Sequence, residues 1–271
     1  MNNMSKKKKA VIWTSSIVGV LVIAILLGLI FTGYYVGWGP FNKMSNIRYR
    51  NMEGNGEEYS VKNVEPLESS PLEGMNICYL GSSVTYGAAS LQESFVEFIA
   101  KRNNTTYVKE AVSGTTLVTT GTGGNSYITR MKKLDKEAKF DLFVCQLSTN
   151  DASQKKPLGN TDSQDPTEIC GAINTIIDYA KDTWKCPILF YTNPYYESDI
   201  YSDMVVSMKE IAKNKKVGLI DLYTDKDFNN ITDIQRKLYM ADKIHPTKAG
   251  YLKWWTPKME EVMYEFVSNS K

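Results

Sequence analysis

The feature that most limits the possible folds is an alternation of short apolar runs with amphipathic segments, which begins near Met75. Five runs are strand candidates, namely 76–80, 107–112, 140–147, 187–191 and 217–222, and of these 140–147 and 187–191 have the apolar composition of buried strands. Helical spacing of apolar residues predicts helices over 91–102, 166–184 (with Asp165 as N-cap), 204–213 and 248–267. Strands that alternate with helices predict an α/β domain, a three-layer αβα sandwich around a parallel five-stranded sheet.

An apolar stretch near the N-terminus sets a second constraint. Residues 10–31 contain no charged side chain, follow the lysine cluster 6–9, and are long enough to cross a membrane as a helix, which needs about 20 residues. Aromatic residues stand near both ends, as in the interfacial belts of membrane helices: Trp13, Tyr34, Tyr35 and Trp38. The sequence therefore predicts a basic cytoplasmic tail (1–9), a transmembrane anchor with its aromatic interface (10–38), and a domain outside the cell.

A cleaved signal peptide is the alternative interpretation of this segment. Its apolar region is usually 7–15 residues long and ends at a site of small residues. Here the apolar run is longer, and bulky aromatic residues occupy the place of the cleavage site. The pattern favours an uncleaved, single-pass anchor in the cell membrane.

Residues 39–73 have glycines, prolines and scattered charges with little periodicity. This composition predicts a linker or lead-in, with a short strand near 59–64, before the α/β domain over 74–271. Beyond residue 40, 28 basic residues face 30 acidic ones, and no basic cluster alternates with aromatic residues. Nucleic acid is therefore not expected as a partner.

The four cysteines include no CxxC pair, and the chain has a single histidine, so no zinc-ligand spacing can be assembled. Cys78 and Cys145 lie in apolar runs and are expected in the core. A disulfide between Cys170 and Cys186 is left open, because connectivity does not follow from spacing.

Polar residues that can carry chemistry follow the strand candidates, where open α/β sheets place their sites. Histidine is the usual general base, and His245 is the only one in the chain. Asp242, three residues earlier, can orient its ring, and Ser83 on the turn after the first strand can act as the nucleophile. The backbone N–H groups of Ser83 and Gly114, with the side-chain amide of Asn150, are the expected donors to an oxyanion.

These segments resemble the blocks of the SGNH, or GDSL-like, hydrolase family. Gly81-Ser82-Ser83 matches the nucleophile turn, Gly114 the glycine of the second block, Ser148-Thr149-Asn150-Asp151 the third block, and Asp242 to His245 the Asp-x-x-His block. The resemblance covers roughly residues 75–267 and implies a flavodoxin-like fold with the catalytic triad Ser83, Asp242 and His245. Its oxyanion hole would consist of Ser83, Gly114 and Asn150, with no metal or cofactor.

Three residues depart from the family pattern. Ser82 replaces the usual Asp after the first glycine, Lys109 stands where the second block often has Asn, and Ser148 replaces the glycine of the third block. None of these changes removes a catalytic group. The side chain of Ser148 would narrow or re-aim the acyl pocket.

The resemblance implies a serine esterase that hydrolyses carboxylic esters through an acyl-serine. With the predicted membrane orientation, an acylated carbohydrate, such as an O-acetylated cell-surface polysaccharide, is the expected substrate, together with small esters. An O-acyltransferase that uses the same triad, a glycan-binding module without catalysis, and a thioesterase or protease-like activity are the alternatives. The sequence leaves the oligomeric state open.

Overall fold

The computed structural model describes residues 6–36, 39–119 and 124–269. The chain divides into two compact units between Met52 and Glu53. The first contains the helix α1 (Lys6–Phe31), the π turn η1 (Thr32–Val36), the 3-10 turn η2 (Asn42–Met44) and α2 (Ser45–Arg50).

Helix α1 is apolar around its whole circumference from residue 16 onward. The stretch Ser16–Tyr35 has a mean hydropathy of 2.7 over 20 residues, and it is the one helix of the described chain that is long and apolar enough to cross a membrane. Its apolar side chains are exposed, for example Leu21 and Ile25. Residues 1–5 of the predicted tail and Trp38 of the predicted aromatic interface lie outside the described residues.

The second unit is built on a five-stranded sheet in the order β2-β1-β3-β4-β5. The strands β1 (Asn76–Gly81), β2 (Thr106–Ala111), β3 (Leu142–Gln146), β4 (Ile188–Tyr191) and β5 (Gly218–Ile220) are all parallel. This order reverses direction between β1 and β3, which is where flavodoxin-like folds open a crevice at the carboxyl ends of the strands. The predicted three-layer α/β fold with a five-stranded parallel sheet is confirmed.

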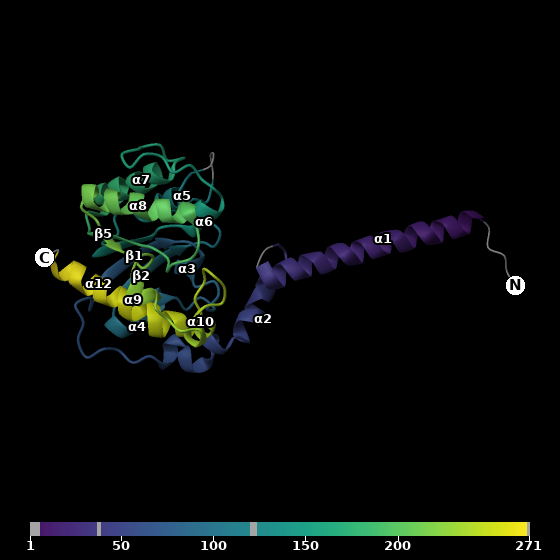
Figure 1. Cartoon of the computed structure of the whole chain (residues 1–271), viewed down its shortest axis with the longest axis horizontal. Helices are drawn as coiled ribbons and strands as arrows, with labels where there is room; N and C mark the ends of the chain where they lie inside the picture. The colour runs from purple at the N-terminus through teal and green to yellow at the C-terminus, as the bar shows by residue number, and fades with distance from the viewer. Residues whose placement is uncertain (1–5, 37–38, 120–123, 270–271) are drawn as a thin grey trace. The chain divides into compact units, whose positions relative to one another are not determined.

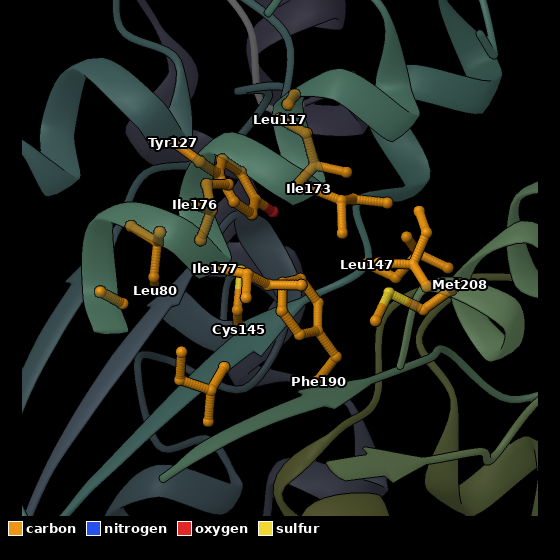
Figure 2. Packing of buried hydrophobic residues seen from close by; sticks show 14 of the residues in the cluster. Leu80, Leu117, Tyr127, Cys145, Leu147, Ile173, Ile176, Ile177, Phe190 and Met208 are labelled. Carbon is orange, nitrogen blue, oxygen red and sulfur yellow. The ribbon is translucent and has the colours of Figure 1, made fainter. Parts of the chain in front are cut away.

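Alternate side chains of β1, β3 and β4 enter two separate cores, whereas the edge strand β2 has exposed or partly buried side chains and contributes to neither. In β1, Cys78 and Leu80 join the core beneath α5 (Tyr127–Met131), α7 (Ile169–Trp184) and α8 (Asp199–Lys215). Ile77 and Tyr79 join the core on the other face, with α4 (Phe95–Asn103) and α12 (Thr256–Asn269). Figure 1 shows the two helical layers, and Figure 2 shows the first core. Full burial of each large apolar side chain contributes about 1.5–3 kcal/mol to the stability of the folded state, so the cores on both faces stabilise the sheet.

Short elements complete the second unit. Three 3-10 turns precede the sheet, and small helices follow several strands: η3 (Glu53–Asn55), η4 (Glu57–Tyr59), η5 (Val61–Asn63), α3 (Ser83–Tyr86), α6 (Thr149–Ser153), α9 (Lys226–Asn229), α10 (Asp233–Tyr239), α11 (Lys248–Gly250) and the π turn η6 (Tyr251–Trp255). The short strand expected near 59–64 is wrong, because these residues form the turns η4 and η5.

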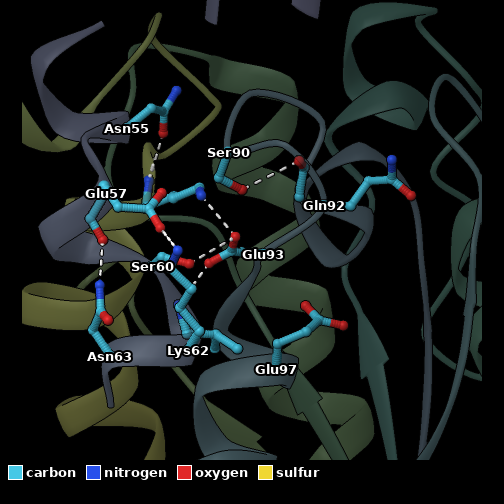
Figure 3. Close-up of polar contacts among 12 residues, drawn as sticks. Asn55, Glu57, Ser60, Lys62, Asn63, Ser90, Gln92, Glu93 and Glu97 are labelled. Carbon is cyan, nitrogen blue, oxygen red and sulfur yellow. Dashed lines mark hydrogen bonds and ion pairs between the residues drawn. The ribbon is translucent and has the colours of Figure 1, made fainter. Parts of the chain in front are cut away.

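Hydrogen bonds attach the 3-10 turns to the rest of the second unit, among them the bond from Ser60 to Glu93 that Figure 3 shows. The Glu93 carboxylate accepts hydrogen bonds from Val61 N (2.6 Å) and Ser60 Oγ (3.2 Å), and it forms an ion pair with Lys248 Nζ (2.6 Å). Asn55 Oδ1 accepts the Lys248 N–H (2.9 Å). Residues 53–63 therefore pack on the sheet domain.

Two predicted helices begin later in the structure than expected. Helix α4 begins at Phe95 and not at Leu91, because Leu91 has a positive φ of 58° and Ser94 forms the capping box. Helix α7 begins at Ile169, and Asp165 is not its N-cap. The Asp165 carboxylate instead accepts the Thr167 N–H (2.9 Å) in a local turn that precedes the helix.

Candidate active site

The serine of the predicted nucleophile block lies on a tight turn between β1 and α3. Ser82 is the N-cap and Ser83 the first helical residue, so the Ser83 N–H has no partner within its own helix. Only glycine fits at position 81, because a Cβ there would collide with Thr85 Oγ1. The turn thus presents Ser83 Oγ at the carboxyl end of the sheet.

A buried glutamine holds this turn from below. Gln146 Oε1, at the end of β3, accepts hydrogen bonds from Ser82 N (2.8 Å), Thr85 Oγ1 (3.0 Å) and Tyr127 OH (3.3 Å). Thr85 Oγ1 also bonds to Tyr191 OH (2.6 Å). Sequence reasoning missed Gln146, since it stands inside an apolar run and its partners come from three separate elements.

The aspartate and the histidine share one short loop. Asp242 Oδ1 accepts the backbone N–H groups of Ile244 and His245, both at 2.8 Å. An antiparallel bridge between Met240 and Pro246 closes the loop at its base. Asn193, on the segment after β4, donates from Nδ2 to the Ile244 carbonyl (3.1 Å) and was also missed from the sequence.

The three predicted triad residues are in contact through hydrogen bonds. His245 Nε2 lies 2.7 Å from Ser83 Oγ, and His245 Nδ1 lies 2.9 Å from Asp242 Oδ2. Partial burial raises the pKa of Asp242, but hydrogen bonds and charge attraction from His245 outweigh it and hold this pKa at about 2. An ionised Asp242 only accepts, so the Nδ1 proton faces it and the Nε2 lone pair faces the Ser83 hydroxyl.

The predicted oxyanion donors come from the loops after β2 and β3. Gly114 has a φ of +79° and open space where a side chain would stand. This is a conformation that favours glycine and lets a ligand approach the backbone. Asn150 Nδ2 donates one hydrogen to the Thr115 carbonyl (2.9 Å), which orients the amide and leaves its second hydrogen for a ligand.

A buried arginine fixes the loop that carries Gly114. Arg130 Nη2 donates to the Gly81 carbonyl (2.8 Å) and to Thr115 Oγ1 (3.0 Å), and Nη1 donates to the Glu110 carbonyl (2.8 Å). The guanidinium therefore joins the ends of β1 and β2 to the loop after β2. Nothing in the sequence around Arg130 distinguishes it from an exposed helical arginine, so it was not predicted.

Asp151 supports the same loop from the other side. Its carboxylate is fully buried and accepts the N–H groups of Leu117 (2.8 Å) and Val118 (3.2 Å). Burial raises the pKa of Asp151 to about 6, and the backbone hydrogen bond from Leu117 is the largest opposing contribution. Asp151 therefore has a structural role, because it holds the backbone of the loop after β2.

The raised pKa of Asp151 gives a pH-dependent stability. The folded protein binds this proton more tightly than the unfolded chain, so the contribution of Asp151 is greatest below pH 3.8 and falls as the pH rises to about 6. Relative to Asp151→Asn, the free energy of unfolding of the wild type should fall by about 2 kcal/mol between pH 4 and pH 7. Urea unfolding of both proteins across this range measures the difference. Parallel pH profiles would contradict the assignment.

Replacement of Asn150 should mainly lower kcat. Loss of one oxyanion donor typically costs about 10²–10³-fold in kcat, and Asn150→Ala removes the amide without touching the Ser83–His245 pair. Steady-state hydrolysis of p-nitrophenyl acetate gives kcat, and Ser153→Ala, in the same short helix, is the matched control. A change of less than about threefold in Asn150→Ala would remove Asn150 from the oxyanion hole.

Across the described part of the chain no cluster of three His, Cys, Asp or Glu side chains has metal-binding geometry. All four cysteines are free and buried, so Cys170 and Cys186 do not form the disulfide that the sequence left open. Burial raises the pKa of the Cys186 thiol to about 11, which keeps it protonated and unreactive.

The fold and this site define an ester-hydrolysing serine hydrolase on an α/β scaffold. The chain belongs to the GDSL-like lipase/acylhydrolase family, whose model matches residues 79–253. The predicted SGNH, or GDSL-like, membership is thereby confirmed. No curated protein matches the chain.

Solved structures share the fold at low sequence identity. A protein from Lactobacillus plantarum is 18% identical with a TM-score of 0.60, over 73% of this chain and 98% of that one. A carbohydrate acetylesterase family member from Sinorhizobium meliloti is 14% identical with a TM-score of 0.51, over 72% and 99%. The acetyl xylan esterase AlAXEase is 15% identical with a TM-score of 0.52, over 68% and 98%.

The residues that depart from the family pattern have structural partners here. Ser82 is buried and its hydroxyl donates to Gln146 Oε1 (3.2 Å). Lys109 Nζ forms an ion pair with Glu97 (2.6 Å). The Ser148 hydroxyl accepts the Asn150 N–H (3.1 Å) as the N-cap of α6, so it helps to position the amide of Asn150.

Proposed function

We propose that this protein is an extracytoplasmic esterase that removes O-acetyl groups from carbohydrate through an acyl-Ser83 intermediate. One observation carries the proposal: Ser83 Oγ, His245 and Asp242 form a continuous hydrogen-bond chain of 2.7 and 2.9 Å. This hydrogen-bond chain begins at the carboxyl end of β1. The loops that carry Gly114 and Asn150 start at the carboxyl ends of the neighbouring strands. No metal or cofactor takes part in the proposed reaction.

In the first half-reaction, Ser83 Oγ attacks the ester carbonyl carbon while its proton passes to His245 Nε2. Asp242 stabilises the imidazolium that results. The N–H groups of Ser83 and Gly114 and the amide Nδ2 of Asn150 donate hydrogen bonds to the former carbonyl oxygen and stabilise its negative charge. When the tetrahedral intermediate collapses, the bond to the alcohol oxygen breaks, and His245 returns the proton to that oxygen.

In the second half-reaction, water replaces the alcohol. His245 Nε2 takes a proton from the attacking water, and the same donors stabilise the second oxyanion. Collapse releases the carboxylic acid and returns the proton to Ser83 Oγ, which restores the starting state. If a sugar hydroxyl attacks instead of water, the same steps give acyl transfer.

The substrate and location rest on two further observations. The fold is similar to that of a carbohydrate acetylesterase family member and of an acetyl xylan esterase, which supports an acetylated carbohydrate as the substrate. The apolar stretch Ser16–Tyr35, with the lysines 6–9 on its N-terminal side, supports a single-pass anchor with a cytoplasmic N-terminus. Protease digestion of intact and of opened cells, read with an antibody to the domain, tests this orientation. Protection of the domain in intact, wall-stripped cells would contradict it.

The experiment that tests the activity measures acetate release from O-acetylated xylo-oligosaccharides by the full chain in detergent. A Ser83→Ala variant with the same melting temperature is the control. Release of acetate by the wild type alone supports an esterase. Acetyl transfer to an added, labelled oligosaccharide in place of acetate release would identify a transferase, and binding of the oligosaccharide without turnover would identify a binding module.

A further inference from the structure

A pocket of about 710 Å³ adjoins the triad at Asp242, whereas Ser83 and His245 do not line it, and it has no role in the steps above. The segment after β4, the helix α10 and the loop of the triad residues form its walls, with Asp242 and Lys243 contributed by that loop. Its volume is within the usual range of about 300–1,000 Å³ for small-molecule sites. Asp242 lines the pocket and is hydrogen-bonded to His245, so the pocket adjoins the site on the side of His245.

The proton path decides which part of an ester this pocket faces. His245 Nε2 must reach the alcohol oxygen to return its proton, so the alcohol part of the substrate lies on the histidine side. The carbonyl oxygen must reach the donors Gly114 and Asn150, and neither residue lines the pocket. The pocket therefore faces the alcohol and not the acyl group.

An aromatic platform forms one wall. The Tyr195 ring is 58% exposed although its backbone N–H is held by Asn229 Oδ1 (2.9 Å). The ring packs against Tyr223, with 5.3 Å between centroids, and Tyr223 OH donates to the Tyr196 carbonyl (3.1 Å). A rigid, exposed tyrosine ring gives a large contact area at low entropic cost, which suits the C–H face of a sugar ring.

Charged groups of both signs also line the pocket. Arg236 and Lys237 on α10 and the nearby Lys243 line the pocket, and no ion pair involves them within the described residues. Asp233 and Glu197 supply acceptors beside them. Sugar hydroxyls both donate and accept hydrogen bonds, so this mixture fits a polyhydroxylated alcohol and not a fatty alcohol.

We infer that this pocket is the subsite for the sugar that carries the ester, with Tyr195 as the stacking platform and Arg236 as a hydroxyl-binding side chain. The inference rests on the proposed function, and it assigns substrate selection to the alcohol side of the bond. Tyr195 and Tyr196 both line this pocket, whereas Tyr191, at the end of β4, is fully buried.

The test compares two acetate esters in the full chain: O-acetylated xylo-oligosaccharide and hexyl acetate. The wild type should have the higher kcat/KM on the sugar ester. Tyr195→Ala should lower the ratio of the two kcat/KM values about tenfold or more through KM, as expected for loss of a central aromatic contact, and Tyr195→Phe should retain the ratio. Ile234→Ala, an exposed α10 residue that does not line the pocket, is the matched control.

The possible failures are distinguishable. A wild type that hydrolyses no ester would contradict the proposed function itself. A wild type that hydrolyses esters but prefers hexyl acetate, or a Tyr195→Ala variant with an unchanged ratio, would overturn the subsite alone.

Discussion

Ser83→Ala should lower kcat for p-nitrophenyl acetate by about 10³-fold or more, the typical cost when a triad member is removed. Ser83 Oγ is the atom 2.7 Å from His245 Nε2, so the variant leaves the base without a nucleophile to activate. The stability should change little, since Ala keeps the backbone N–H and the helical turn. The measurement is steady-state hydrolysis, with a thermal melt to show that the variant is folded.

The adjacent serine provides a matched control for this experiment. Ser82 is buried one residue away, but its hydroxyl contacts Gln146 and not His245. Ser82→Ala should therefore keep kcat within about tenfold and lose about 1 kcal/mol of stability at most, the usual worth of one hydrogen bond. Equal activity in the wild type and Ser83→Ala would remove Ser83 from the mechanism.

Asp242→Asn should lower kcat by about 10³–10⁴-fold while the loop keeps its shape. Asn can still accept the N–H groups of Ile244 and His245 through Oδ1, which is the role of Asp242 in the backbone turn. Its amide would, however, face His245 Nδ1 with a donor, and this favours the tautomer that has the proton on Nε2. The imidazole would then be unable to take the serine proton, and no negative charge would stabilise the imidazolium.

The pH dependence of kcat shows whether the loss in Asp242→Asn is independent of the ionisation of Asp242 in the wild type. The pKa of Asp242 is about 2, so the wild-type carboxylate is ionised throughout the neutral range, and its stabilising contribution is lost only as the pH falls from about 3.8 toward 2. We therefore expect the loss in Asp242→Asn at every pH from 5 to 9. A variant within tenfold of the wild type over this range would show that His245 works without Asp242.

Local patterns were sufficient for the five strands, the longer helices and the identity of the reacting groups, but not for the short helices between them or for residues 59–64. Apolar runs marked the inner strands such as β3 and β4, since their side chains alternate between two cores, whereas the edge strand β2 carries Lys109 and Glu110 and enters neither core. The order of the four motif segments, with the only histidine in the last, predicted the residues that the structure brings together at the ends of β1, β2 and β3. Helix starts were less predictable, because Ser94 and Asp165 can each serve as a cap or form a local turn.

The sequence by itself therefore determined the parallel α/β fold, the apolar N-terminal helix and the candidate groups Ser83, Asp242 and His245. Only the tertiary structure decided which buried groups hold the site in place: Gln146 and Asn193 support the turns of the triad residues, and Arg130 and Asp151 support the loop of Gly114. The physical reason is that a buried polar atom must find a partner, and that partner is set by packing. Ser83 and His245, which are 162 residues apart, meet for the same reason.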